Sequence, residues 1–169
     1  THSLVDKGVV TCKYKKVNPG KILLTFTMGD KELYDWLGNN PMCEWRQTFY
    51  ANNISVIAQE DNVVAINGSV EVDLYGQVNS ESYGPRMRSG TGGQLDFVIG
   101  AFWSPRRPRD QPGPLDGHER REVQDRSDPR QEGARVTVPR HYTGFIVTEY
   151  GVADLYGRSE PERAEALIN

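Results

Sequence analysis

Residues 104–131, SPRRPRDQPGPLDGHERREVQDRSDPRQ, form a stretch that cannot bury an apolar face. Its only aliphatic side chains are Leu115 and Val123, and arginines alternate with acidic residues along it. Four prolines near its start lack the backbone N–H that a central strand must donate. As written, this segment predicts a loop. Any packed core must therefore be built from the flanking segments.

The length and charge of the chain exclude several classes of protein. At 169 residues it can bury the core of one domain. Its net charge of −3 gives no overall attraction to nucleic acid or anionic membranes. No apolar run approaches the ~18 residues of a membrane helix. Cys12 and Cys43 suit a reducing cytosol and are interpreted as structural or incidental thiols. We expect a soluble, cytoplasmic protein without a membrane partner.

The first third of the chain has the pattern of an α/β unit. The opening SLVDKGVV resembles the end of a helix, with Gly8 as its stop. The apolar run 21–29 predicts a buried strand. Residues 30–41 predict a helix with Asp30 as N-cap and Gly38 at its end. A strand followed by a helix is typical of α/β proteins.

Most of the remaining segments are interpreted as strands. The apolar or alternating runs are residues 44–50, 54–58, 62–72, 95–102, 134–138 and 145–150. Residues 159–169 predict a closing helix, with Ser159 as N-cap and Pro161 in its first turn.

Three loops fall at predicted strand ends, where open α/β sheets bind ligands. They are residues 49–55, 88–97 and 148–155. Each also has a structural interpretation. The asparagine pair of the first loop suits a turn, and the glycines of the second serve tight turns as often as close ligand approach. The glutamate of the third could cap a helix that follows it.

Metal and nucleotide sites are not indicated. His2, His118 and His141 have no ligand spacing, and neither HExxH nor paired CxxC occurs. The chain has no GxxxxGK[ST], and GTGG lacks the complete GxGxxG pattern. We therefore expect no metal and no nucleotide-phosphate site.

Five short motifs occur in one order: NPGK, NNP, EVDLYGQV, SGTGGQLDF and VTEYGVA. In this combination the chain resembles the C-terminal half of the acetyl-CoA hydrolase/transferase family, in the branch of butyryl-CoA:acetate and 4-hydroxybutyrate CoA-transferases. The resemblance covers nearly all of residues 1–169 and is absent from 104–131.

The resemblance implies an α/β fold, with a mixed sheet flanked by helices, that forms one half of a two-domain CoA-transferase. Such an enzyme uses a glutamate to attack an acyl-CoA thioester, giving an acyl-glutamyl anhydride and then a glutamyl-CoA thioester. A dry pocket and fixed hydrogen-bond donors make this attack feasible. Coenzyme A is then a substrate, and no cofactor is permanently bound. The implied partners are an acyl-CoA, a short-chain carboxylate, the N-terminal CoA-transferase domain and further copies of the full-length protein.

The resemblance also assigns roles to residues of the three loops. It implies that the Gly93 N–H donates to the thioester oxyanion, with Gly90 and Gly92 in the same substrate-binding loop. A glycine suits this place because a Cβ would block the thioester. Asn52 matches a substrate-side asparagine, and Glu149 matches a glutamate that positions substrate or nucleophile.

One expected part of the active site is absent. The family's nucleophilic glutamate lies in an HSE-like motif before the helix with which this chain begins, and THSLVDKG contains no glutamate. The following GVVT segment aligns His2 and Ser3 with the later helix. We expect no transferase activity from this chain alone. An acyl-CoA hydrolase and a non-catalytic CoA-binding or interaction fragment are the alternatives.

The genetic code offers an explanation for residues 104–131. Codons compatible with residues 105–129, read one base later, encode RGGRATSLALSTAMNGEKSKIDPI, which has the glycine turn, strand and STAMNG loop of the family. We infer two compensating frameshifts, one near Ser104 and one near Gln131. The rival interpretation is a nucleic-acid segment. It is disfavoured because acidic residues nearly balance the arginines and no aromatic residue is interleaved for base stacking.

Overall fold

The computed structural model describes residues 2–105, 115–117 and 133–168. Most of the segment 104–131 therefore lies outside the described residues. This includes its arginines, so the nucleic-acid interpretation falls there as well.

The N-terminal part forms the predicted α/β unit. Helix α1 (His2–Asp6) is followed by Gly8 at φ +70°, a left-handed conformation that favours glycine. Strand β1 (Ile22–Leu24) pairs in parallel with β2 (Cys43–Trp45), and the helix α2 (Lys31–Leu37) connects them. The predicted helix tail and first helix are confirmed. The buried strand predicted at 21–29 is shorter, Ile22–Leu24, and only half-buried.

The ends of α2 are the predicted ones. The Asp30 carboxylate accepts a hydrogen bond from the Leu33 N–H at 2.9 Å, and Gly38 is the C-cap. An Asp N-cap satisfies an N–H that has no partner within the helix. The local signals of this segment therefore determined its structure.

Two short helices replace predicted strands. The strand predicted at 44–50 ends at Trp45, and α3 (Thr48–Ala51) follows it. The strand predicted at 54–58 is wrong, because α4 (Ile54–Ile57) occupies it. The Asn53 side chain caps α4 by accepting from the Ser55 N–H at 2.9 Å. The β-branched residues of 54–58 are typical of a strand, but the Asn53 cap and the burial of Ile57 favour one helical turn.

The central strands are shorter than predicted. Within 62–72 only β3 (Glu71–Val72) is a strand, and it pairs antiparallel with β4 (Val78–Asn79). A second hairpin joins β5 (Ser82–Tyr83) to β6 (Arg86–Met87). The strand predicted at 134–138 is reduced to one bridge, between Val138 and Val78.

The strand predicted at 95–102 is also wrong, because α5 (Gln94–Trp103) is a helix. Val98 and Ala101, three residues apart, are both 0% exposed, which is the spacing of one helix face. Gly100 faces α4, where an added Cβ would lie 2.6 Å from the Ile57 Cβ. The two helices therefore approach at a distance that only glycine permits.

The C-terminal part combines a mixed sheet with a helix. The strand β7 (Leu115–Gly117) lies parallel to β8 (Phe145–Thr148), which pairs antiparallel with β9 (Gly151–Asp154). Helix α6 (Glu160–Ile168) packs against β9. The expected single mixed sheet is, among the described residues, four small sheets, and only the β7–β8–β9 sheet is mixed.

The predicted cap of α6 is confirmed. The Ser159 hydroxyl and backbone N–H both donate to the Glu162 carboxylate, at 2.6 and 2.8 Å. These hydrogen bonds, from the side chain first and the backbone second, lower the pKa of Glu162 below its ordinary value of 4.5, and nearby Arg158 acts in the same direction.

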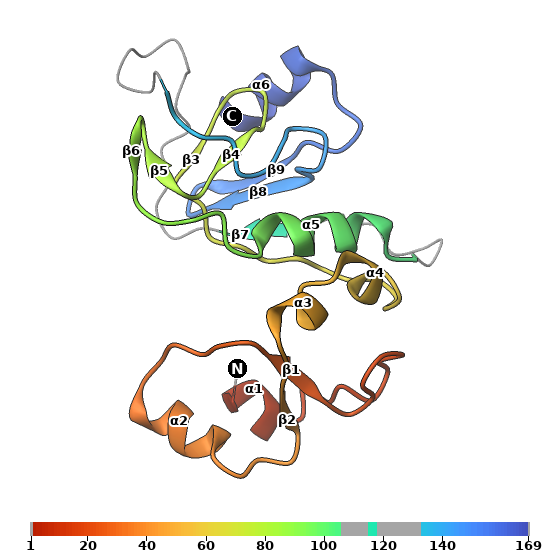
Figure 1. Cartoon of the computed structure of the whole chain (residues 1–169). Coiled ribbons are helices and arrows are strands. Elements are labelled where there is room, and N and C mark those ends of the chain that lie inside the picture. The colour runs from red at the N-terminus through yellow and green to blue at the C-terminus, as the bar shows by residue number, and fades with distance from the viewer. Residues whose placement is uncertain (1, 106–114, 118–132, 169) are drawn as a thin grey trace.

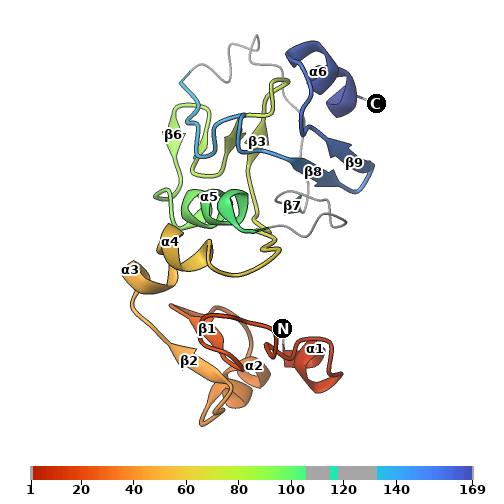
Figure 2. The same cartoon turned by 90° about the vertical axis from the view of Figure 1, so that its right-hand side faces the viewer.

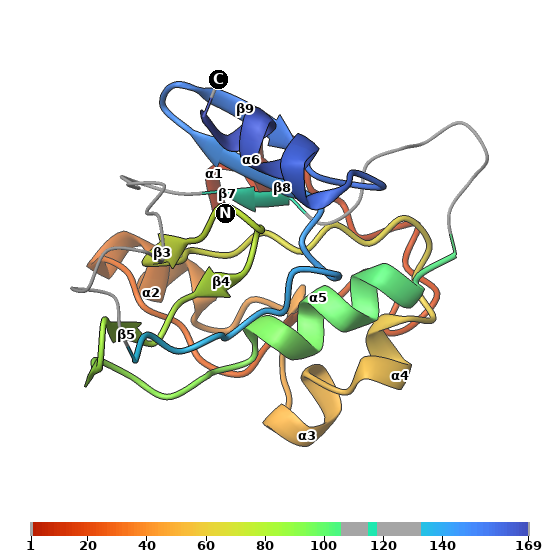
Figure 3. The same cartoon turned by 90° about the horizontal axis from the view of Figure 1, so that it is seen from above.

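The core lies entirely in the C-terminal two-thirds. Its buried members are Ala65, Val72, Val78, Val98, Ala101, Val138, Ile146 and Leu155. Figures 1 and 2 show α1, β1, α2 and β2 grouped together, with α3 and α4 between them and the other elements. Viewed from above, α4 lies beside α5, and α6 lies beside the β8–β9 hairpin (Figure 3). Between residues 2 and 50 no side chain is buried.

Candidate active site

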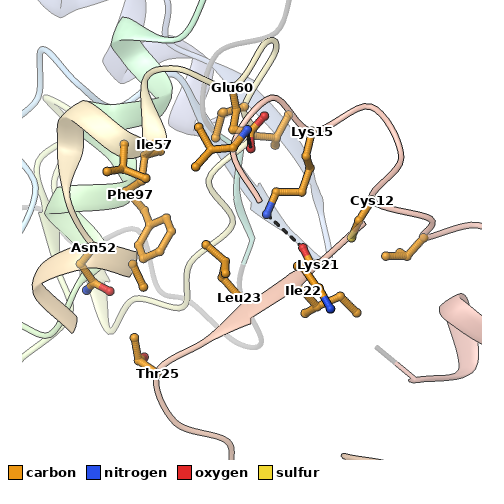
Figure 4. A pocket seen from close by; sticks show the side chains of 16 residues that line it. Cys12, Lys15, Lys21, Ile22, Leu23, Thr25, Asn52, Ile57, Glu60 and Phe97 are labelled. Carbon is orange, nitrogen blue, oxygen red and sulfur yellow. Dashed lines mark hydrogen bonds between the residues drawn. The ribbon is translucent and has the colours of Figure 1, made fainter. Parts of the chain in front are cut away.

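A cavity of about 380 Å³ lies between the N-terminal group and the helices α3, α4 and α5. One wall comes from the segment 10–25, which includes β1. The other comes from α3, α4, the loop that follows to Val64, and Phe97 of α5. Figure 4 shows Asn52, Ile57 and Phe97 on one side of this space and Leu23 and Lys15 on the other. The cavity has the size and mainly apolar lining of a small-molecule site.

Asn52 lies on the cavity wall, at the C-terminal end of α3. Its side-chain amide nitrogen fills the position that a Cβ on Gly93 would take. The structure thus brings together two residues that are far apart in the sequence. The neighbouring Asn53 has the structural role of capping α4, so the turn interpretation of the asparagine pair holds for Asn53.

Gly93 is the N-cap of α5. Its carbonyl accepts from the Phe97 N–H at 3.1 Å, whereas its own N–H donates no hydrogen bond within the described part of the chain. The N-terminal end of a helix carries partial positive charge and free N–H groups, which attract anions. Beside it, the Gln94 side-chain nitrogen is buried without a partner among the described residues. This place can stabilise a negative oxygen.

Gly90 and Gly92 shape the approach to α5. Gly92 has φ +59°, which a side chain rarely adopts, so it supports the turn that starts the helix. Gly90 is exposed, and an added Cβ there would meet nothing within 4 Å. These two glycines do not line the cavity, and neither does Gly93. Their substrate contacts stay a prediction.

Glu149 is not brought together with Asn52 and Gly93. It lies exposed in the turn between β8 and β9 and does not line the cavity. The idea that it caps a following helix is wrong, because the strand β9 comes next. Its role in positioning substrate stays a prediction.

Three cavity residues were missed by the sequence patterns: Lys15, Glu60 and Phe97. The Glu60 carboxylate accepts from the backbone N–H groups of Lys16 and Val17, at 2.7 and 3.1 Å, and so fixes the loop that forms one wall. The Lys15 ammonium donates to the Lys21 carbonyl at 3.1 Å. The Glu60 contacts join segments distant in sequence, and no local motif indicates them.

Cys12 lines the cavity, and its neighbour Cys43 lies on β2. Burial raises the pKa of the Cys43 thiol, and Cys12 raises it further. The Cys43 thiol therefore stays protonated at neutral pH, as suits a structural residue. Across residues 2–105 and 133–168, no group of three or more potential metal ligands comes together, and no helix is long and apolar enough to cross a membrane.

The sequence also assigns the chain to a protein family. The acetyl-CoA hydrolase/transferase C-terminal domain matches residues 29–109 and 122–169, and the chain belongs to this family. The chain is 46% identical over 166 residues to the 4-hydroxybutyrate coenzyme A transferase of Clostridium kluyveri, covering 98% of this chain and 38% of that protein.

Two further proteins are similar to this chain and agree with the family assignment. A probable butyrate:acetyl-CoA coenzyme A-transferase of Syntrophomonas wolfei is 46% identical over 166 residues, covering 98% of this chain and 37% of that protein. The crystal structure of RipA from Yersinia pestis matches with a TM-score of 0.80 at 36% identity, covering 99% of this chain and 37% of that one. The chain thus spans less than two-fifths of the length of these proteins.

Proposed function

We propose that this chain is the C-terminal part of a cytoplasmic CoA-transferase that moves CoA between a short-chain acyl-CoA and a carboxylic acid such as acetate. One observation carries the proposal: Asn52 lines an apolar cavity, and its amide lies against Gly93 at the positive end of α5. The names of the relatives at 46% identity support the short-chain substrates.

The proposed reaction proceeds by double displacement. A glutamate carboxylate, which the resemblance places before residue 1, attacks the thioester carbonyl carbon. The C–S bond breaks, CoA leaves as a thiolate, and an acyl-glutamyl anhydride forms. The thiolate then attacks the glutamyl carbonyl carbon, and the donor acid leaves as a carboxylate. An acceptor carboxylate reverses these steps on the glutamyl-CoA thioester.

In this scheme each site residue has one task. The Gly93 N–H donates to the thioester oxygen as it becomes negative, and the dipole of α5 adds to this stabilisation. Asn52, beside Gly93, orients the substrate, and Gly90 and Gly92 let the substrate approach the start of the helix. Glu149 positions the substrate or the nucleophile once the rest of the enzyme is present.

The N-terminal CoA-transferase domain is the proposed partner of residues 2–50, which carry several large apolar side chains in contact with solvent. These are Tyr14, Phe26, Met28, Trp45 and Phe49. A two-stranded parallel sheet such as β1–β2 is seldom stable without cover on both faces. The remaining three-fifths of the protein would supply that cover and complete this half of a two-domain enzyme, which we expect to form homo-oligomers.

There are two alternatives to CoA transfer. A hydrolase would release the acyl group to water, and hydrolysis and transfer differ in how well the site excludes water. A non-catalytic fragment would bind CoA or another protein without turnover. The apolar cavity favours water exclusion and therefore transfer.

The test uses the full-length protein that contains this chain, incubated with butyryl-CoA. We expect acetyl-CoA to form only when acetate is added, and mass spectrometry without acetate to find one CoA bound to a glutamate. The 169-residue chain alone should give neither signal. Release of free CoA independent of acetate would indicate the hydrolase, and transfer by the isolated chain would refute the assignment of the nucleophile.

A further inference from the structure

Phe97 lies on the same helix as Gly93, whose N–H is the proposed oxyanion donor, and it lines the cavity. It lies one helical turn after Gly93, since its N–H donates to the Gly93 carbonyl at 3.1 Å. Aromatic side chains on helices point back toward the N-terminus, over the residue four positions earlier. That residue is Gly93, which has no side chain of its own. The Asn52 amide lies against Gly93 and, like Phe97, lines the cavity.

The Phe97 ring also forms part of the cavity wall. Figure 4 shows it beside Asn52 and Ile57 and facing Leu23 across the space. Unlike Asn52, the cavity side chains of β1 and α4 are aliphatic: Ile22 and Leu23 from β1, and Val56 and Ile57 from α4. An apolar wall of this kind suits a hydrocarbon chain better than a carboxylate or phosphate.

We propose that Phe97 sets the size limit for the acyl group, because its ring lines the cavity beside Asn52, the residue that lies against Gly93. This inference rests on the proposed CoA-transferase function. A thioester bound to the Gly93 N–H would direct its acyl chain past Asn52 into the cavity that Phe97 lines. Short linear acyl groups fit beside the ring, whereas longer ones collide with it.

A direct test compares acyl-CoA substrates of increasing length in the full-length protein. The measurement is kcat/KM for acetyl-CoA, butyryl-CoA and hexanoyl-CoA in wild type, Phe97→Ala and Phe97→Leu. One methylene in an apolar pocket changes kcat/KM by about 10-fold or more. We expect Phe97→Ala to raise the hexanoyl-to-acetyl ratio by at least that factor, and Phe97→Leu to raise it less.

The matched control is Trp103→Ala, which removes another aromatic side chain of α5. Trp103 is 65% exposed and does not line the cavity, so its loss should leave the ratio unchanged. Phe97→Leu keeps an apolar side chain at the site and is therefore the variant to use if Phe97→Ala does not fold.

The outcomes separate this inference from the proposed function. If wild type transfers CoA but both Phe97 variants keep the wild-type ratio, or lose activity equally on all three substrates, Phe97 does not set acyl length. If full-length wild type transfers no CoA from any of the three, the proposed function fails and the inference falls with it. If the hexanoyl-to-acetyl ratio rises in the Phe97 variants but not in Trp103→Ala, the result supports both the proposed function and the role of Phe97.

Discussion

Gly93 and Asn52 show how a single glycine can be required for two reasons. The resemblance explains Gly93 by the approach of a thioester. The structure adds that the Asn52 amide already fills the position of a Cβ. Replacing Gly93 by any other residue would therefore displace a second site residue, before substrate is considered.

We expect Gly93→Ala to destabilise the full-length protein by about 1–3 kcal/mol, the usual cost of overpacking. We also expect it to lower kcat/KM for CoA transfer by about 100-fold, through misplacement of Asn52. Urea unfolding and the transfer assay measure the two effects. Gly68→Ala is the control, because an added Cβ there meets nothing within 4 Å.

A double-mutant cycle identifies the cause of this effect. In an Asn52→Ala background the side chain that blocks the Cβ is gone, so Gly93→Ala should cost less stability than in wild type. Equal costs in both backgrounds would show that the Asn52 contact is not responsible.

The cap of α6 predicts a pH dependence. Because hydrogen bonds from Ser159 lower the pKa of Glu162 in the folded protein, its ionised form stabilises the fold. This stabilisation is present above the unfolded pKa and is lost as the pH falls through the lower folded value. Wild type should therefore be more stable than Ser159→Ala at pH 7, and the difference should shrink below about pH 4. Urea unfolding from pH 3 to pH 7 measures it, and a difference independent of pH would contradict the cap.

At the scale of elements, α5 was the main error of the sequence interpretation. Its short apolar run, 95–102, satisfies the pattern of a buried strand as well as that of a buried helix. Packing decided between them, because Val98 and Ala101 face the core while Gly100 contacts α4. The helix matters for chemistry, since it converts the glycine loop into a helix N-terminus that attracts negative charge.

The contact of α5 with α4 can be tested at Gly100. An added Cβ would lie 2.6 Å from the Ile57 Cβ, so Gly100→Ala should cost about 1–3 kcal/mol of stability. Ile57→Ala costs stability by itself, but combining the two should recover part of the Gly100→Ala penalty. The measurement is urea unfolding of the four proteins, and strict additivity would argue against close packing of these helices.

The segment 104–131 leads to a prediction about the gene. The family domain matches up to residue 109 and resumes at 122, so the unmatched residues fall inside this segment. We expect resequencing to find one-base changes near Ser104 and Gln131 that restore the STAMNG reading. A continuous frame that encodes the Arg/Pro version, with no offset relative to homologous genes, would refute the hypothesis.

At the scale of the whole molecule, the described residues form a buried core and a group of elements without buried side chains. The core lies between β3, β4, α5, β8 and α6, whereas residues 2–50 bury no side chain. Elements with few buried contacts unfold locally at low free-energy cost, so their amide hydrogens exchange fast.

Hydrogen exchange therefore tests the proposed partner of this group. In the 169-residue chain alone, the amides of β1 and α2 should exchange faster than those of α5 and β8. In the full-length protein, the same β1 and α2 amides should become protected, because the N-terminal domain covers them. Equal protection of β1 in both forms would contradict this arrangement.

The sequence by itself determined the features that depend on neighbouring residues. The cap of α2 by Asp30, the stop at Gly8 and the cap of α6 by Ser159 need only contacts a few residues apart. The ordered motifs likewise identified the family. Tertiary structure alone decided that 95–102 is a helix, that Asn52 meets Gly93, and that Phe97 and Glu60 border the cavity. These features depend on contacts between segments distant in sequence, and a local pattern carries no information about which distant side chain will fill a given space.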